Sequence, residues 1–173
     1  SVLFNYAQSG HPGGSVSSGR FVAAALFNAM DYDIGDPNRR DADLLSYAAG
    51  HKALGLYAML AMRDEAVRIG NPGLLPSHDR LRLRFEDLLG FRRNPTQATP
   101  LFRRFASKAL DGHPTPATPF VKLATGASGV GFGASLGLAL AAADYFGKDA
   151  PRVHIVEGEG GLPLLRRGPG GRG

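Results

Sequence analysis

The sequence predicts an α/β fold, in which helices alternate along the chain with short buried strands. Two apolar runs, 44–48 and 153–156, have the length and composition of buried strands, and each ends at a glycine-containing turn. Helical spacing of apolar residues precedes the first run, and an Ala-rich helical stretch precedes the second. A helix, a strand and then a Gly-rich turn at the carboxyl end of the strand is an order typical of α/β proteins.

The first half of the chain contains one expected strand between two expected helices. Apolar residues recur at helical spacing over 16–30, and a polar loop follows to residue 43. The strand at 44–48 ends at Gly50-His51, and a helix rich in Ala, Leu and Met is expected from there to about residue 69. The candidate amino-terminal caps of the first helix are Ser15, Ser17 and Ser18.

The second half contains a break, two further helices within a loop region, and then a glycine-rich stretch. A helix is expected over about 78–89, and the proline-rich segment 91–120 is expected to be mostly loop with one short helix near 101–109. The Gly-rich stretch 124–133 leads into an alanine-rich helix to about residue 146. The strand at 153–156 completes the predicted order.

Composition excludes several classes of protein. The 173 residues are 43% hydrophobic and 20% charged, which is an ordinary globular balance. The absence of cysteine excludes disulfides and thiolate sites, and it fits a reducing cytoplasm. No run approaches 18 uncharged apolar residues, so we expect no membrane span, and no secretory leader is expected at the start of the chain.

The positive charge does not indicate a nucleic-acid-binding protein. Subtracting the three arginines of the tail at 163–173 from the formal charge of +5 leaves +2. The arginines between residues 80 and 104 have no interleaved aromatic residues and lie among acids, which favours a solvated helix face. They are Arg80, Arg82, Arg84, Arg92, Arg93, Arg103 and Arg104.

Three histidines share one local pattern, because His11, His51 and His113 each follow a glycine. His11 and His113 also precede proline, so their imidazoles are held in turns, where a pKa near neutrality is useful for proton transfer. A surface turn is the bland alternative for any one of them. His78 and His154 have no such context, and we expect structural roles for both, with His154 in a strand.

Two glycine-containing segments are candidates for binding phosphate. Exposed N–H groups in the series at 126, 129, 131 and 133 can bind anions at a helix start, although close helix packing explains these glycines equally well. After the second strand, Gly158-Glu159-Gly160 places a carboxylate at the strand's carboxyl end, where it can reach a divalent cation. A polar turn is the alternative there.

Taken in order, these motifs resemble the amino-terminal part of the transketolase family of thiamine diphosphate enzymes. The resemblance covers about residues 5–162, and five motifs in the family's order make it specific. They are residues 8–15 with Gly-His-Pro-Gly-Gly, 45–53 with Gly-His, 112–114 with the second Gly-His-Pro, 125–131 with Thr-Gly-x-x-Gly-x-Gly, and 158–160 in place of Gly-Asp-Gly.

The resemblance implies a fold, a cofactor and a set of roles. The fold is a thiamine diphosphate-binding α/β fold, a parallel sheet flanked by helices that here forms an incomplete diphosphate-binding module. The implied reaction is transfer of a two-carbon ketol unit between sugar phosphates, with thiamine diphosphate and Mg²⁺ as cofactors. His11 and His113 would be catalytic and move protons at the sugar, and Glu159 would bind the metal. The implied cofactor-binding residues are His51, Gly126, Ser128, Gly158 and Gly160.

The sequence departs from the family pattern at several positions. Glu159 replaces the usual Asp, Ser128 stands where a larger apolar residue is common, and Leu164 stands where an acid is usual. The second metal ligand and the pyrimidine-binding module, which carries the activating glutamate, are expected elsewhere in the protein. We therefore interpret 1–162 as part of a diphosphate-binding module and 163–173 as a low-complexity tail that is not its native continuation.

These departures keep other interpretations open. We expect this chain alone to be inactive, and its partner to be a missing segment or a separate subunit in a homodimer or two-subunit assembly. A non-catalytic relative that acts as a binding or regulatory module is one alternative. A related thiamine enzyme, such as a 2-oxoacid dehydrogenase component, is another, although the paired Gly-His-Pro motifs favour a sugar substrate.

Overall fold

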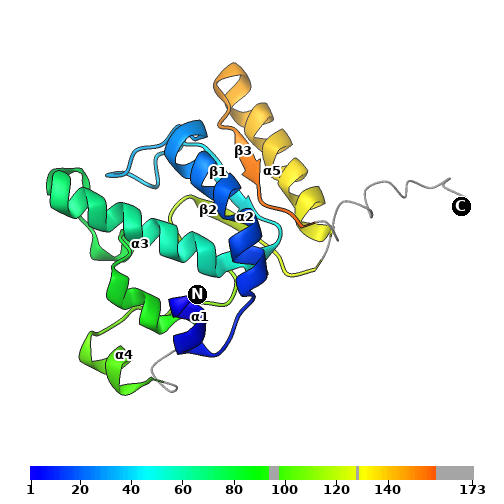
Figure 1. Ribbon diagram of the computed structural model, residues 1–173. Helices are drawn as coiled ribbons and strands as arrows, with labels where there is room; N and C mark the ends of the chain where they lie inside the picture. Colours follow the sequence, from blue (N-terminus) through cyan, green and yellow to red (C-terminus); the bar gives the residue numbers. More distant parts are fainter. Residues whose placement is uncertain (94–97, 128, 159–173) are drawn as a thin grey trace, which may run out of the picture.

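The computed structural model describes residues 1–93, 98–127 and 129–158, and Figure 1 shows how their helices and strands are arranged. Three strands form one sheet in the order β2-β1-β3, and β1 pairs parallel with both neighbours. This confirms the predicted parallel α/β fold. The elements are α1 (Val2–Ala7), α2 (Pro12–Ala24), β1 (Leu44–Tyr47), α3 (Ala53–Gly70), α4 (Pro100–Arg104), β2 (Val121–Ala124), α5 (Val130–Phe146) and β3 (Val153–Ile155).

The central strand β1 is covered on both faces because its side chains alternate between two helical layers. Leu45 and Tyr47 are fully buried in the hydrophobic core, where they join Leu56 and Leu60 of α3. Ser46 points to the opposite face, and its hydroxyl lies 2.6 Å from the hydroxyl of Ser135 on α5. The helices α3 and α5 therefore flank opposite faces of the sheet, as Figure 1 shows.

Helix α2 begins at Pro12, four residues before the predicted start, so the predicted caps are wrong. Proline suits the first turn of a helix because its missing N–H needs no partner there, and His11 is the N-cap residue without a side-chain hydrogen bond. The three serines act within the helix: Ser15 donates to the carbonyl of Lys52, while Ser17 and Ser18 donate to the carbonyl of Gly14. The helix ends in a π-helical turn, Ala25–Ala29.

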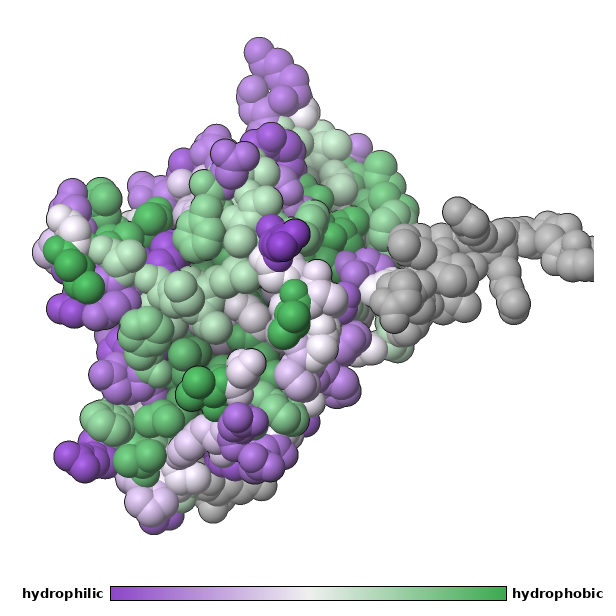
Figure 2. All heavy atoms as spheres, viewed as in Figure 1, coloured by the Kyte–Doolittle hydropathy of each residue, from purple (hydrophilic) through white to green (hydrophobic). Residues whose placement is uncertain are grey.

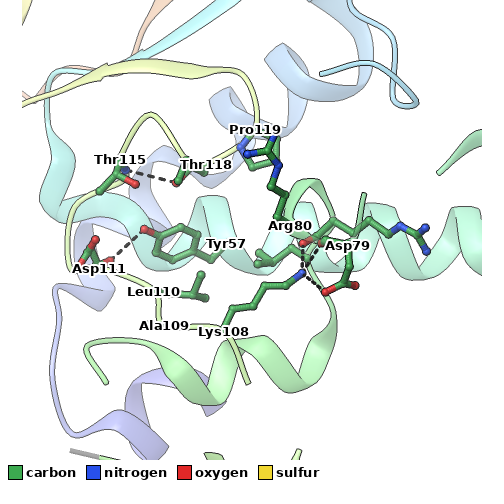
Figure 3. A pocket seen from close by; sticks show the side chains of 13 residues that line it. Tyr57, Asp79, Arg80, Lys108, Ala109, Leu110, Asp111, Thr115, Thr118 and Pro119 are labelled. Carbon is green, nitrogen blue, oxygen red and sulfur yellow. Dashed lines mark hydrogen bonds and ion pairs between the residues drawn. The ribbon is translucent and has the colours of Figure 1, made fainter. Parts of the chain in front are cut away.

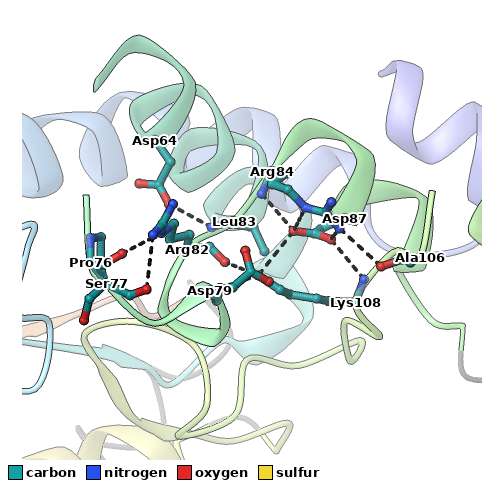
Figure 4. Close-up of polar contacts among 10 residues, drawn as sticks. All are labelled: Asp64, Pro76, Ser77, Asp79, Arg82, Leu83, Arg84, Asp87, Ala106 and Lys108. Carbon is teal, nitrogen blue, oxygen red and sulfur yellow. Dashed lines mark hydrogen bonds and ion pairs between the residues drawn. The ribbon is translucent and has the colours of Figure 1, made fainter. Parts of the chain in front are cut away.

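The helix predicted over 78–89 is replaced by two short 3₁₀ turns, Asp79–Leu81 and Phe85–Gly90. Buried carboxylates take the N–H groups that a continuous helix would have used. Asp64 of α3 accepts the N–H of Leu83 at 2.8 Å, and Asp87 accepts that of Arg84 at 2.9 Å (Figure 4). The second predicted helix of this region is also shorter than expected, since α4 has only five residues.

Arg103 and Arg104 are exposed in α4, whereas Arg82 and Arg84 do not belong to the solvated helix face that we expected. The guanidinium of Arg82 donates to the carbonyls of Pro76 and Ser77, and that of Arg84 donates to Asp87 and to the carbonyl of Ala106 (Figure 4). These contacts hold an irregular segment in place because they use carbonyls that have no helical partner.

Helix α5 has an apolar face that the rest of the described chain leaves uncovered. It contacts all three strands on one side, while Leu136, Leu140 and Tyr145 are 48%, 66% and 75% exposed on the other. Figure 2 shows this apolar surface at the upper right. By length and composition alone, Val130–Asp149 could cross a membrane. One such helix is weak evidence for a span, because core helices meet the same criterion.

Asp87 anchors the segment between α3 and β2. Its side chain is fully buried and accepts hydrogen bonds from Arg84 and from the N–H of Lys108, whose ammonium lies 3.6 Å away. Burial by itself would raise the pKa of Asp87, but these hydrogen bonds outweigh it and hold the pKa below its ordinary value of 3.8. The stabilisation is therefore present above pH 3.8 and is lost as the pH falls through the lower, folded-state pKa.

Replacing Asp87 by Asn should lower the free energy of unfolding by about 3 kcal/mol at pH 7, because the Arg84 and Lys108 cations lose a buried counter-charge. Urea denaturation at pH 7, 5 and 3 measures this, and the difference from the wild type should shrink below the ordinary carboxyl pKa. Asp79→Asn is the matched control, since Asp79 also contacts Lys108 but is 69% exposed, and it should cost less than about 1 kcal/mol. Equal effects of the two substitutions would contradict the assignment.

Candidate functional site at the carboxyl ends of the strands

The carboxyl ends of the three strands lie together because all three run parallel. Hydrogen bonds join the loops that leave them: the N–H of Gly50 donates to Thr125 at 2.8 Å, and the N–H of Ala49 donates to Val156 at 2.8 Å. The turn after β1 carries His51, the loop after β2 carries Gly126, and β3 leads to Glu157 and Gly158. One edge of the sheet thus collects three of the predicted motifs.

The three glycine-preceded histidines meet at this edge. The rings of His11 and His51 pack edge to face with their centroids 5.1 Å apart. His113 lies against two glycines, because a Cβ at Gly126 would be 3.2 Å from its Nε2 and a Cβ at Gly50 would overlap its ring. His11 and His113 therefore line one site although they are 102 positions apart in the sequence. The catalytic and binding roles that we assigned to the three histidines stay predictions.

Not every predicted site residue can be placed. Gly158 lies three residues after the end of β3, and its N–H donates to Glu157 Oε1 at 2.7 Å. Ser128, Glu159 and Gly160 lie outside the described residues, as does the boundary predicted at residue 162. Within the described part of the chain, no group of three or more His, Asp or Glu side chains is arranged to hold a metal ion.

The glycine series at 126–133 includes one residue with the close-packing role that we considered, while the anion-binding role stays a prediction. Gly129 has a φ of +83° and caps α5, a conformation that suits glycine. Gly131 allows α5 to approach β1, since a Cβ there would lie 2.5 Å from Cα of Ala48. The Thr125 hydroxyl donates to Ala48 at 2.8 Å. Close packing therefore explains Gly131, while Gly126 borders His113.

Tyr57 supports the His113 loop from α3, a role that sequence reasoning missed. Its hydroxyl donates to the carbonyl of Asp111 at 3.0 Å, two residues before His113. Burial raises the pKa of Tyr57 to about 12, so the hydroxyl keeps its proton and remains a donor. Figure 3 shows the tyrosine pointing toward Asp111 beside a cavity of about 280 Å³. An apolar helix gives no sequence signal for this contact.

Lys52 and Glu157 are two further polar residues of this edge that sequence reasoning did not assign. Lys52 is only 8% exposed, and its ammonium donates to the carbonyl of Glu157 at 3.2 Å. The second carboxylate oxygen of Glu157, Oε2, is buried and has no hydrogen-bond partner in the described chain. The signal that could have identified Lys52 is its position directly after His51 in the turn that follows β1.

His154 has the structural position that we predicted. It lies on β3 at the amino-terminal side of the sheet, and its Nε2 is 3.1 Å from the buried carboxylate of Asp43. Asp43 also accepts the N–H groups of Asp31 and Arg152 at 3.0 and 2.8 Å. Burial favours a higher pKa for Asp43, but the N–H of Asp31 and the other hydrogen bonds hold it below the ordinary value.

The fold and the loops define a class of protein: a parallel α/β module whose glycine-containing loops and histidines gather at the carboxyl ends of the strands. No protein-family model matches the sequence. The chain is 32% identical to the transketolase of Mus musculus over 154 residues, and 32% identical to that of Homo sapiens over 156 residues. It is also 29% identical, over 154 residues, to one subunit of the apulose-4-phosphate transketolase of Actinobacillus succinogenes.

Solved structures agree with these sequences. A crystal structure of a transketolase variant from Pichia stipitis matches 92% of the chain with a TM-score of 0.62 and 27% identity. The chain is therefore similar in sequence and in fold to part of a transketolase. It spans about a fifth of the length of the mammalian relatives, 21% of the Pichia structure and 45% of the Actinobacillus relative.

Replacing Gly131 by Ala should destabilise the protein by about 1–3 kcal/mol, because the added methyl group overlaps Ala48 at the end of β1. Gly133→Ala is the matched control on the same helix, since nothing lies within 4 Å of its Cβ position. It should stabilise the helix by up to about 1 kcal/mol. Thermal unfolding of the two variants measures both effects, and a stabilised Gly131→Ala variant would refute the close approach.

Proposed function

We propose that the protein is a thiamine diphosphate- and Mg²⁺-dependent enzyme that transfers a two-carbon ketol unit between sugar phosphates. This chain would form the part that binds the diphosphate. The observation that carries the proposal is the meeting of His11, His51 and His113 with Gly126 at the carboxyl ends of parallel strands. Similarity to transketolases over 89% of the chain supports it.

The residues of this edge fit a magnesium-bound diphosphate. Such a group needs donors for its oxygens and an acidic oxygen for the cation. The ammonium of Lys52 is a buried donor, and Glu157 Oε2 is a buried acceptor without a partner in the part of the chain that the structure describes. The bare Cα of Gly158 allows a ligand to approach the backbone closely, with Lys52 Nζ 3.8 Å from its Cβ position.

Each site residue then has a defined task. His51 and Gly158 would contact the diphosphate, and Gly126 would lie near the cofactor rings. Imidazoles titrate near neutral pH, so His11 and His113 can hold and move protons at the oxygens of the sugar. When bound, the cofactor supplies the carbon nucleophile that attacks a ketose carbonyl and carries the two-carbon unit. We assign Glu159 to the metal, and Ser128 and Gly160 to the cofactor, from the sequence pattern.

The substrates and partners follow from the same proposal. The Actinobacillus relative is named for a sugar phosphate and as one subunit of its enzyme, which supports sugar phosphate substrates and favours a two-subunit or homodimeric assembly. A pyrimidine-binding module, in the same protein or in a separate subunit, would complete the site. A cytoplasmic location agrees with the substrates and with the lack of cysteine.

In the full-length protein, His51→Ala should weaken Mg²⁺-dependent binding of thiamine diphosphate at least tenfold, because a charge-assisted hydrogen bond to the diphosphate is lost. Isothermal titration calorimetry measures the dissociation constant. His78→Ala is the control, since His78 is exposed on the segment that precedes the Asp79–Leu81 turn. Absence of binding to the wild type would refute the proposed function.

His113→Asn should leave cofactor affinity within about twofold and lower kcat/KM for ketose phosphate by roughly a hundredfold or more, the usual size of an acid–base contribution. A coupled assay with ketose phosphate donors measures turnover, and pyruvate tests the 2-oxoacid alternative. Cofactor binding by the wild type without turnover of either substrate would favour the non-catalytic alternative.

A further inference from the structure

Lys52 is a buried cation. The aliphatic part of its side chain packs against Gly14, where the absence of a side chain leaves room for it. The side chain passes against the first turn of α2, where a Cβ at Gly14 would lie 2.8 Å from Cγ of Lys52. The carbonyl of Lys52 is held by the hydroxyl of Ser15 at 3.0 Å, and the same hydroxyl accepts the N–H of Gly55. These contacts hold the backbone of Lys52 in one position between α2 and α3, from which its side chain reaches β3.

The charge of Lys52 has no counter-charge in the described part of the chain. Its ammonium has three N–H donors, and one of them is given to the carbonyl of Glu157 at 3.2 Å. Among residues 1–93, 98–127 and 129–158, no carboxylate oxygen lies within 4.0 Å of this nitrogen. A buried ammonium without a paired anion is unfavourable, so its position is best explained by an anion that is not among the described residues.

The surroundings of Lys52 define the kind of anion. The nitrogen lies 3.8 Å from the Cβ position of Gly158, so no side chain at that residue separates it from the loop after β3. It borders a cavity of about 340 Å³ together with Ser17, Ser18 and Glu157. The carboxylate of Glu157 would repel a free anion, whereas an anion that carries its own divalent cation satisfies both residues.

We propose that Lys52 binds the phosphate oxygens of a magnesium-bound diphosphate at the carboxyl ends of β1 and β3. This inference rests on the proposed function, in which that diphosphate belongs to the cofactor. It adds a fixed positive charge to a site for which the sequence motifs assigned only histidine, glycine, serine and one carboxylate. The alternative task for Lys52 is structural, namely to attach the end of β3 to α2 through the carbonyl of Glu157.

The test compares Lys52→Met with the wild type in the full-length protein. Methionine keeps an unbranched stem of similar length and removes only the charge. Calorimetric titration with inorganic diphosphate and Mg²⁺, and separately with thiamine diphosphate and Mg²⁺, should show affinity about tenfold to a hundredfold lower. Lys122→Met, at an exposed lysine on β2, is the matched control and should change affinity less than twofold. Thiamine without phosphate should bind the wild type and Lys52→Met equally.

Melting temperature without ligand separates the two tasks of Lys52. Removing an unpaired buried charge should leave the melting temperature of Lys52→Met equal to or above that of the wild type. A lower melting temperature with unchanged diphosphate affinity would show that Lys52 is only structural and would overturn the inference, as would equal affinities alone. If the wild type binds magnesium diphosphate through Lys52 but not thiamine diphosphate, the inference stands and the proposed function fails. If it binds neither, both fail.

Discussion

The parallel pairing of β1 with both of its neighbours is the constraint on which the rest of the structure depends. Because β2 and β3 run in the same direction as β1, the loops that leave all three strands must emerge at one edge. Helices α3 and α5 cover opposite faces of the sheet, so the central strand β1 is buried on both sides. The site at the carboxyl ends is thus a consequence of strand direction, and the glycines at 50, 126 and 131 are needed because the loops are crowded there.

Two sequence patterns predicted regular elements. Helical spacing of apolar residues over many positions predicted helices, and short uninterrupted apolar runs predicted strands. The strands β1 and β3 and the helices α3 and α5 follow from such patterns. The region 78–89 has a similar pattern but is irregular, because Asp64 and Asp87 accept its N–H groups from outside a helical register. Such competition depends on tertiary neighbours, and the short helix α1 likewise gave no periodic signal.

The candidate site divides in the same way. The histidines were predictable because a glycine or proline beside each imidazole is visible in the sequence itself. Lys52 and Tyr57 were not, because their roles depend on partners 105 and 54 residues away. The sequence motifs outline the site. The structure adds the buried ammonium of Lys52 and the hydrogen bond by which Tyr57 supports the His113 loop. With the likeness to transketolases, these features favour a diphosphate ligand whose charge is balanced by residues from several elements.

Asp43 makes the contacts at the two edges of the sheet different in kind. At the amino-terminal edge its carboxylate contacts Arg152 and His154 through three hydrogen bonds, and it accepts a fourth from the N–H of Asp31. At the other edge the loops are joined mainly by single backbone hydrogen bonds and one ammonium group. The contacts at the amino-terminal edge therefore depend on the charge of one carboxylate, whereas the hydrogen bonds from Gly50 to Thr125 and from Ala49 to Val156 involve only neutral backbone groups.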